Sequence, residues 1–178
     1  MTVLTTNQKG AIAEQAVILE CAKLGISVSR PLNDERYDLI LDVDSTLLRI
    51  QCKWGVKVDD IVAIRLYSSR RGPSGTINRK YSADDIDGFA AYCMETGACY
   101  FIPVSLACQR VISLRVGPTR NNQASGIRWA KDFDFAGTIK RRGPIAQLGE
   151  RLAGSQKVAG SSPAGSIKRD HSAAILAR

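Results

Sequence analysis

The sequence contains a single histidine, His171, and no apolar run near the ~18–20 residues that a membrane-spanning helix needs. The N-terminus also lacks the charged and then apolar pattern of a secretion signal. Because His171 lies in a Gly- and Ser-rich stretch near the C-terminus, we expect neither histidine-based catalysis nor a histidine-ligated metal. These absences predict a cytoplasmic protein with no membrane partner.

The cysteines form no pattern that would hold a fold together covalently. Their number is odd and no two of them make a Cys-x-x-Cys pair, which argues against a disulfide framework and a zinc knuckle. The five are Cys21, Cys52, Cys93, Cys99 and Cys108. We therefore expect reduced thiols, with Cys52 packed in the core.

Negative charge is scarce, since 17 acidic residues face 25 basic ones and the net charge is +8. Residues 141–178 carry +5 of this excess, so residues 1–140 carry only +3. A basic chain can bind a polyanion with release of counterions, although charge alone does not establish a nucleic-acid partner. The 178 residues, 44% of them hydrophobic, suit one domain with its own core, with or without an appendage.

Hydrophobic periodicity predicts a helix from Asn7, as its N-cap, to Leu24, and a second helix over 83–96 after Ser82 as its cap. Apolar or alternating runs predict strands over 26–30, 61–67, 99–104 and 109–116, loops over 68–80 and 117–126, and a last element near 127–135. This order predicts an α/β fold with a mixed central sheet flanked by helices.

The most informative stretch reads as two strands, 37–43 and 46–54, joined by a tight turn at Asp44 and Ser45. With that turn, Asp38 lies opposite Gln51, and Lys53 lies diagonally across from Asp38 on the same face. The register is a prediction, because a slip by one residue would scatter these side chains.

An acid, an amide and an amine on one face can support the metal-assisted hydrolysis of phosphodiesters. Asp38 and Gln51 offer oxygen ligands to Mg2+, and Lys53 can orient the attacking water and offset negative charge. Glu14, on the N-terminal helix, could reach over the sheet as a further ligand. The alternative is an ordinary ion pair between Asp38 and Lys53 on a solvated face, and spacing alone favours that alternative.

The order of motifs along the chain favours the catalytic interpretation over the ordinary ion pair. Asp38 and the Gln51-Cys52-Lys53 triplet, with twelve residues between them, resemble the PD-(D/E)XK nuclease motif, with Gln in place of the second acid. The whole series resembles the branch that contains homing endonucleases encoded in group I introns, some of which also use Gln-x-Lys. It consists of Asn7-x-Lys9-Gly10-x-x-x-Glu14, Tyr37-Asp38, Asp87-x-Phe89-Ala90-x-Tyr92 and Cys99-Tyr-Phe-Ile-Pro103.

The resemblance implies a restriction-endonuclease-like core in residues 1–140. It implies that Glu14, Asp38, Gln51 and Lys53 are catalytic and that the first three hold Mg2+. Two departures stand out, since Tyr37 replaces the usual proline and Gln51 carries no charge. A neutral amide weakens metal affinity relative to a carboxylate.

Double-stranded DNA is the expected partner of a chain with this resemblance. Basic residues in the predicted 68–80 loop suit phosphate contacts, as does Lys9 near the helix start. The candidates are Lys9, Arg70, Arg71, Arg79 and Lys80. One active site cuts one strand, so we expect a homodimer or homotetramer associated with the nucleoid.

Residues 141–178 have the Gly/Ser-rich composition of a disordered tail. Gly160-Ser-Ser-Pro163 matches one reading frame of a bacterial tRNA T-arm, so the tail could be a translated tRNA exon rather than a plain basic tail. The sequence thus predicts a site-specific double-strand endonuclease that homes into an intronless tRNA gene. A Holliday-junction resolvase and a non-catalytic nucleic-acid-binding protein on a decayed nuclease fold are the alternatives.

Overall fold

The computed structural model describes residues 3–73, 75–119 and 125–141. Helix α1 covers Thr6–Lys23 and begins with a capping box, in which the Thr5 hydroxyl accepts from the Gln8 N–H and Gln8 Oε1 accepts from the Thr5 N–H. The predicted Asn7 cap is therefore wrong by two residues, because only Thr5 has a partner three residues on that completes the reciprocal pair.

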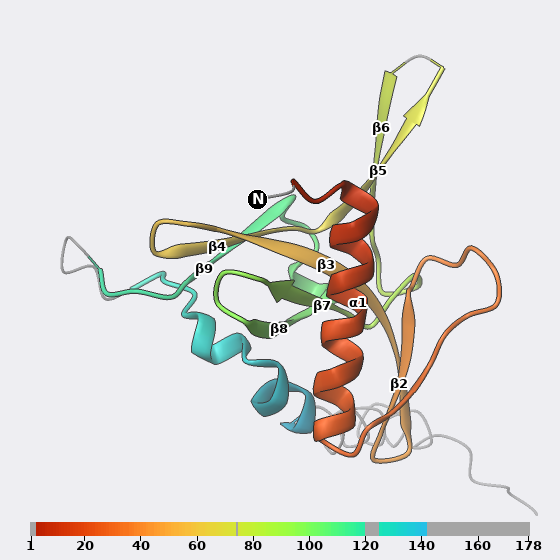
Figure 1. Cartoon of the computed structure of the whole chain (residues 1–178), viewed down its shortest axis with the longest axis horizontal. Helices are drawn as coiled ribbons and strands as arrows, with labels where there is room; N and C mark the ends of the chain where they lie inside the picture. Colours follow the sequence, from red (N-terminus) through yellow and green to blue (C-terminus); the bar gives the residue numbers. More distant parts are fainter. Residues whose placement is uncertain (1–2, 74, 120–124, 142–178) are drawn as a thin grey trace, which may run out of the picture.

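A seven-stranded mixed sheet forms the centre of the fold (Figure 1). Its strands are β1 Ser27–Ser29, β2 Leu39–Val43, β3 Thr46–Val58, β4 Ile61–Arg65, β7 Gly88–Cys93, β8 Ala98–Pro103 and β9 Val111–Arg115. They run in the order β1-β2-β3-β4-β9, while β7 pairs in parallel with β3 and antiparallel with β8. The predicted α/β class with a mixed sheet is confirmed, as are the strands expected over 26–30, 61–67, 99–104 and 109–116.

The long strand β3 leaves a gap that matters for function. Its residues 46–50 pair with β2 and its residues 55–58 pair with β4, while residues 50–55 pair with β7. Since β7 lies opposite β2 at Ile50 and opposite β4 at Gly55, β2 and β4 share one edge of β3. Among the described strands, none continues the ladder on that edge between Gln51 and Trp54.

The predicted β2–β3 hairpin is confirmed together with its register. Leu39 pairs with Ile50 and Val43 pairs with Thr46. Asp44 and Ser45 both have positive φ, 50° and 66°, as a two-residue turn of type I′ requires.

The predicted helix over 83–96 is wrong. Ser82 and Asp85 do interact, through the Ser82 N–H and the Asp85 carboxylate, but they close a turn that leads into β7. The run Gly88–Cys93 is buried on both faces, and such a strand has no alternation that separates it from a buried helix. A Cβ on Gly88 would lie 2.5 Å from Phe101 Cζ, so this position needs glycine for close strand packing.

The predicted loop over 68–80 is also wrong, because it folds into a two-stranded hairpin. Strand β5 (Tyr67–Gly72) pairs with β6 (Gly75–Lys80), and the hairpin projects away from the body (Figure 1). All described β6 residues are exposed, so no buried face imposes an alternating apolar pattern. The segment therefore reads as a loop in sequence.

Two layers of core cover the two faces of the sheet. Helix α1 packs on one face, where Val17 and Cys21 join Leu39, Ile50 and Cys52. This confirms the prediction that Cys52 packs in the core. Later segments close the layers, namely the 3-10 helices η1 (Val104–Leu106) and η2 (Ala130–Phe133) and a helical stretch over 135–141. The second core layer is formed by Val62, Ile64, Leu66, Ile86, Phe89, Ile102, Ile112 and Leu114, among others.

The structure also bears on the predictions made from composition. All five cysteines are free, and four of them are buried. Within the described ranges, no helix is both long and apolar enough to cross a membrane. The predicted tail lies outside the described residues, apart from Arg141.

Candidate active site

Asp38 bridges the gap in the sheet edge. Its N–H donates to the Ile50 carbonyl at 2.9 Å, which continues the β2–β3 ladder by one residue. Its Oδ2 accepts from the Cys52 N–H at 2.7 Å, a backbone donor that lies in the gap between β2 and β4. Gln51 Nε2 donates to the same oxygen. The carboxylate of Asp38 is thus fixed by the backbone that carries Gln51 and Lys53.

The environment of Asp38 disfavours its negative charge. Burial raises the pKa of Asp38 to about 6, the Cys52 N–H opposes this rise, and the charge of Glu14 adds to it. A cation beside Asp38 would favour the charged form again. A bound cation would therefore offset the cost of burying this charge.

Gln51 projects from β3 between two partners. Its Nε2 bonds Asp38, and its Oε1 accepts from the Tyr81 hydroxyl at 2.9 Å. The predicted opposition of Asp38 and Gln51 is therefore seen as a direct contact.

Lys53 lies two residues further along β3 and is mostly buried. Its Nζ donates to the Tyr67 carbonyl at 3.3 Å and lies 4.9 Å from the centre of the Tyr81 ring. Burial lowers the pKa of Lys53 to about 8, although the charge of Asp38 opposes this, and the charge of Arg36 lowers it further. Lys53 is a constrained amine beside the carboxylate rather than a partner in a solvated ion pair.

Glu14 approaches the site from α1. Its carboxylate pairs with Arg30 at 3.2 Å, and its charge contributes to the raised pKa of Asp38. The described residues contain no group of three or more His, Cys, Asp or Glu that could hold a metal alone. Asp38, Gln51 and Glu14 would nevertheless suit Mg2+, which prefers oxygen ligands and keeps several positions for water and phosphate oxygens.

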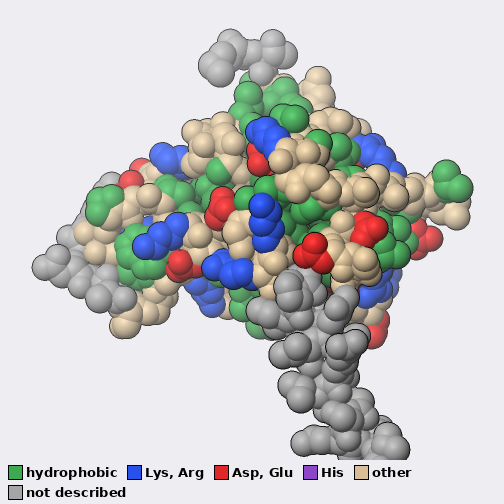
Figure 2. Space-filling model, turned by 90° about the horizontal axis from the view of Figure 1, so that it is seen from below, with side chains coloured by type: hydrophobic (Ala, Val, Ile, Leu, Met, Phe, Trp, Pro, Cys, Tyr) green, Lys and Arg blue, Asp and Glu red, His purple; other side chains and the backbone are tan. Residues whose placement is uncertain are grey.

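The predicted DNA-contacting residues fall into two places. Lys9 lies in the first turns of α1, half-buried, whereas the hairpin β5–β6 carries the other four, all exposed. Those four are Arg70, Arg71, Arg79 and Lys80. Figure 2 shows basic and acidic side chains interspersed over one face of the molecule, without a continuous field of one sign. The hairpin concentrates positive charge on a projecting element.

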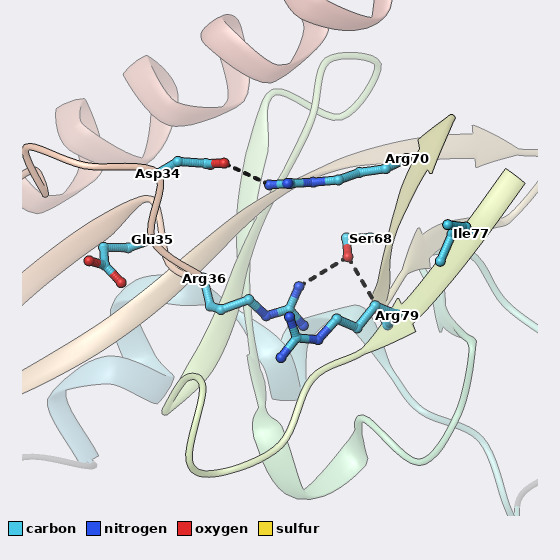
Figure 3. A pocket seen from close by; sticks show the side chains of 7 residues that line it. All are labelled: Asp34, Glu35, Arg36, Ser68, Arg70, Ile77 and Arg79. Carbon is cyan, nitrogen blue, oxygen red and sulfur yellow. Dashed lines mark hydrogen bonds and ion pairs between the residues drawn. The ribbon is translucent and has the colours of Figure 1, made fainter. Parts of the chain in front are cut away.

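A hollow of about 310 Å³ lies between the segment 34–36 and the hairpin (Figure 3). Arg70 pairs with Asp34 at 2.9 Å across it, and both side chains are largely exposed. Such a pair is weak, so a phosphate can compete for the arginine. The lining consists of Asp34, Glu35, Arg36, Ser68, Arg70, Ile77 and Arg79.

Sequence reasoning missed two residues beside the site, Tyr81 and Arg36. Arg36 donates to Ser68 Oγ at 3.1 Å, to the Lys80 carbonyl at 2.8 Å and to Asp85 at 3.3 Å, and its guanidinium lies 4.0 Å from the centre of the Tyr81 ring. Tyr81 is 30 positions from Gln51 and joins it only through the fold. The one sequence signal was its place directly after a basic stretch.

Comparisons with known proteins show which family the chain belongs to. A bacterial homing endonuclease of solved structure, I-Ssp6803I, is 27% identical to this chain, with a TM-score of 0.67, and the match covers 81% of this chain and 99% of that protein. No curated protein matches the chain. The sequence profile described as PD-(D/E)XK endonuclease matches residues 4–136, a span that includes Glu14, Asp38, Gln51 and Lys53. This chain belongs to the PD-(D/E)XK endonuclease family.

Proposed function

We propose that the protein is a Mg2+-dependent, site-specific double-strand DNA endonuclease of the homing type. The observation that carries this proposal is the convergence of Asp38, Gln51 and Lys53 in the gap of β3, with Glu14 close enough to raise the pKa of Asp38. The likeness to I-Ssp6803I, a bacterial homing endonuclease, supports the homing type.

Each residue then has a defined task. Asp38 and Gln51 would hold Mg2+ with help from Glu14, and the bound ion would polarise the scissile phosphate and lower the pKa of a coordinated water. The Lys53 ammonium would donate a hydrogen bond to the attacking water and offset the charge that develops on phosphorus oxygens. The Tyr67 carbonyl keeps Lys53 Nζ in place before substrate binds.

DNA binding is assigned to the hairpin β5–β6 and to Lys9. Arg70, Arg71, Arg79 and Lys80 stand on strands that project from the body, so they can follow the phosphates or enter a groove. Because both strands must be cut, the active form would be a homodimer or homotetramer.

The proposed target is the intronless form of a tRNA gene. The support is the segment Gly160-Ser-Ser-Pro163, which a T-arm would encode if the reading frame ran from an intron into the downstream exon. This segment lies outside the described residues. Sequencing the encoding DNA tests the idea, because serine codons other than TCN at Ser161 and AGY at Ser162 would refute it.

The first experiment compares two linear DNAs, the joined tRNA exons and the same locus with its intron, in Mg2+ or in EDTA. Asp38→Ala and Lys53→Ala are the test variants. Asp42→Ala and Lys57→Ala are matched controls, since each exposed side chain lies four residues further along the chain than the residue that it matches, in β2 and β3 respectively. We expect cutting only of the intronless DNA, only with Mg2+, and only by the wild type and the controls.

Two results would contradict the proposal in different ways. Binding without cutting would indicate a decayed nuclease. The uncharged Gln51, in place of the second acid, would then account for the missing activity. Cutting of branched junctions irrespective of sequence would indicate a junction resolvase on the same fold.

A further inference from the structure

Tyr81 touches two of the four candidate catalytic residues. It follows β6 directly and is 7% exposed. Its hydroxyl donates to Gln51 Oε1 at 2.9 Å, and its ring centre lies 4.9 Å from Lys53 Nζ. Tyr81 thus joins the amide and the amine of the candidate site.

Gln51 needs a partner that a carboxylate at this position would not need. Both ends of a carboxylate are oxygens, whereas one end of an amide is an NH2 group that would repel a cation. In the structure Nε2 faces Asp38 and Oε1 faces Tyr81. To share a cation with Asp38, the amide must present Oε1 on the Asp38 side.

A tyrosine hydroxyl suits this exchange, because it can both donate and accept a hydrogen bond. It donates to Oε1 in the present orientation, and it can accept from Nε2 after the amide turns over. The Tyr81 hydroxyl can therefore hold the plane of the Gln51 amide in both orientations. A partner that only donates, or only accepts, would favour one orientation and oppose the other.

The ring of Tyr81 is fixed by contacts that do not involve Gln51. It meets Phe89 edge to face, with ring centres 5.4 Å apart and planes at 90°. The Arg36 guanidinium lies 4.0 Å from its centre and is itself tied to Ser68, Asp85 and the Lys80 carbonyl. Removing only the hydroxyl should therefore leave the ring, and its contact with Lys53, where they are.

We propose that Tyr81 is a positioning residue that holds the Gln51 amide in the plane from which its oxygen can share a cation with Asp38. The inference rests on the proposed function, and it explains how an uncharged residue can serve in place of the second acid. Tyr81 does not touch substrate or metal and acts through Gln51.

The test is Tyr81→Phe in the full-length protein. We expect the Mg2+ concentration for half-maximal cleavage to rise by about 10-fold, as for other groups that orient metal ligands, with a smaller change in the rate at saturating Mg2+. Mn2+ binding measured by titration calorimetry should weaken by a similar factor, while DNA binding in EDTA should be unchanged. Tyr100→Phe is the matched control, since Tyr100 is also buried and its hydroxyl contacts Thr96 at 3.2 Å.

A second background separates positioning from a general structural role. In Gln51→Glu, either carboxylate oxygen can face the cation, so adding Tyr81→Phe should change the Mg2+ requirement by less than about 2-fold. Equal losses in both backgrounds, or an equal loss in Tyr100→Phe, would overturn the inference, as would an unchanged Mg2+ and Mn2+ dependence of Tyr81→Phe.

The calorimetry keeps this inference apart from the proposed function. Asp38→Ala defines the Mn2+ signal that comes from the site. If the wild type binds Mn2+ through Asp38 but cuts no DNA, the proposed function fails while the role of Tyr81 is still decided by the Tyr81→Phe titration. If Asp38→Ala leaves Mn2+ binding unchanged, the site holds no cation and both proposals fail.

Discussion

At the scale of single residues, Asp38 combines two tasks that oppose each other. It completes the β2–β3 ladder and accepts the Cys52 N–H, which ties it to the fold. Burial and the charge of Glu14 nevertheless make its charged form costly, as the rise of its pKa to about 6 indicates. The buried charge costs stability, and the proposed role of Asp38 in holding a cation would account for its presence here.

This conflict predicts that Asp38→Asn stabilises the metal-free protein. The Asp38 pKa is raised from 3.8, so its contribution to wild-type stability is fully present below that value and is lost as the pH rises through about 6. In EDTA at pH 7.5, the free energy of unfolding of Asp38→Asn should exceed that of wild type by about 1–3 kcal/mol, since two pKa units correspond to roughly 3 kcal/mol.

Denaturant unfolding at several pH values measures this difference. The gap between Asp38→Asn and wild type should be small at pH 4 and level above pH 6. Asp42→Asn, with an exposed side chain on β2, is the control and should show no such gap. A variant that is less stable than wild type at pH 7.5 would show that the hydrogen bond from Cys52 outweighs burial.

Tyr81 shows where residue-level sequence reasoning ends. Asp38, Gln51 and Lys53 could be brought together from the sequence, because a two-residue turn fixes which positions of a hairpin face each other. Tyr81 reaches Gln51 only after the hairpin β5–β6 has returned the chain to the sheet. No local period connects positions that far apart, so only the folded chain reveals the contact.

At the scale of elements, the same limit explains the two wrong assignments. The segment Gly88–Cys93 is buried on both faces, and the segment Gly75–Lys80 is exposed on both. Neither carries the alternation that a half-buried strand shows, so one read as a helix and the other as a loop. Strands β2 and β3, each with alternating burial, were predicted with the correct register.

The proposed role of the hairpin β5–β6 in DNA binding leads to a separate prediction. Arg71→Ala and Lys80→Ala each remove one exposed cation. If each contacts one phosphate, each should reduce the slope of log K against log salt by about 0.9. Fluorescence anisotropy with one duplex between about 50 and 200 mM KCl, where phosphate contacts make affinity fall steeply, provides the comparison.

Lys57→Ala is the control for the hairpin, because Lys57 is also exposed but lies near the β3–β4 turn. Its slope should equal that of wild type. Equal reductions in all three variants would indicate a diffuse effect of net charge rather than contacts made by the hairpin.

At the scale of the whole molecule, the described part of one chain contains one gap in β3 and one set of Asp38, Gln51 and Lys53. In the proposed reaction, one such set would serve the attack of water on one phosphate at a time, and the two strands of a duplex run in opposite directions. Two chains related by a two-fold axis would place one set against each strand. We expect analytical ultracentrifugation to give an assembly mass of two or four times the 19.3 kDa of one chain.

Mixed assemblies test how the two cuts are divided between chains. Wild type and Asp38→Ala, co-expressed with different tags and purified through both, give assemblies with active and inactive sites together. A dimer of this kind should nick supercoiled plasmid carrying the target without linearising it, because the inactive site leaves its strand intact. Asp42→Ala in place of Asp38→Ala should restore linear product, since that exposed carboxylate lies outside the gap. Linear product from the Asp38→Ala mixture would mean that one site cuts both strands in turn, and the need for a symmetric pair would disappear.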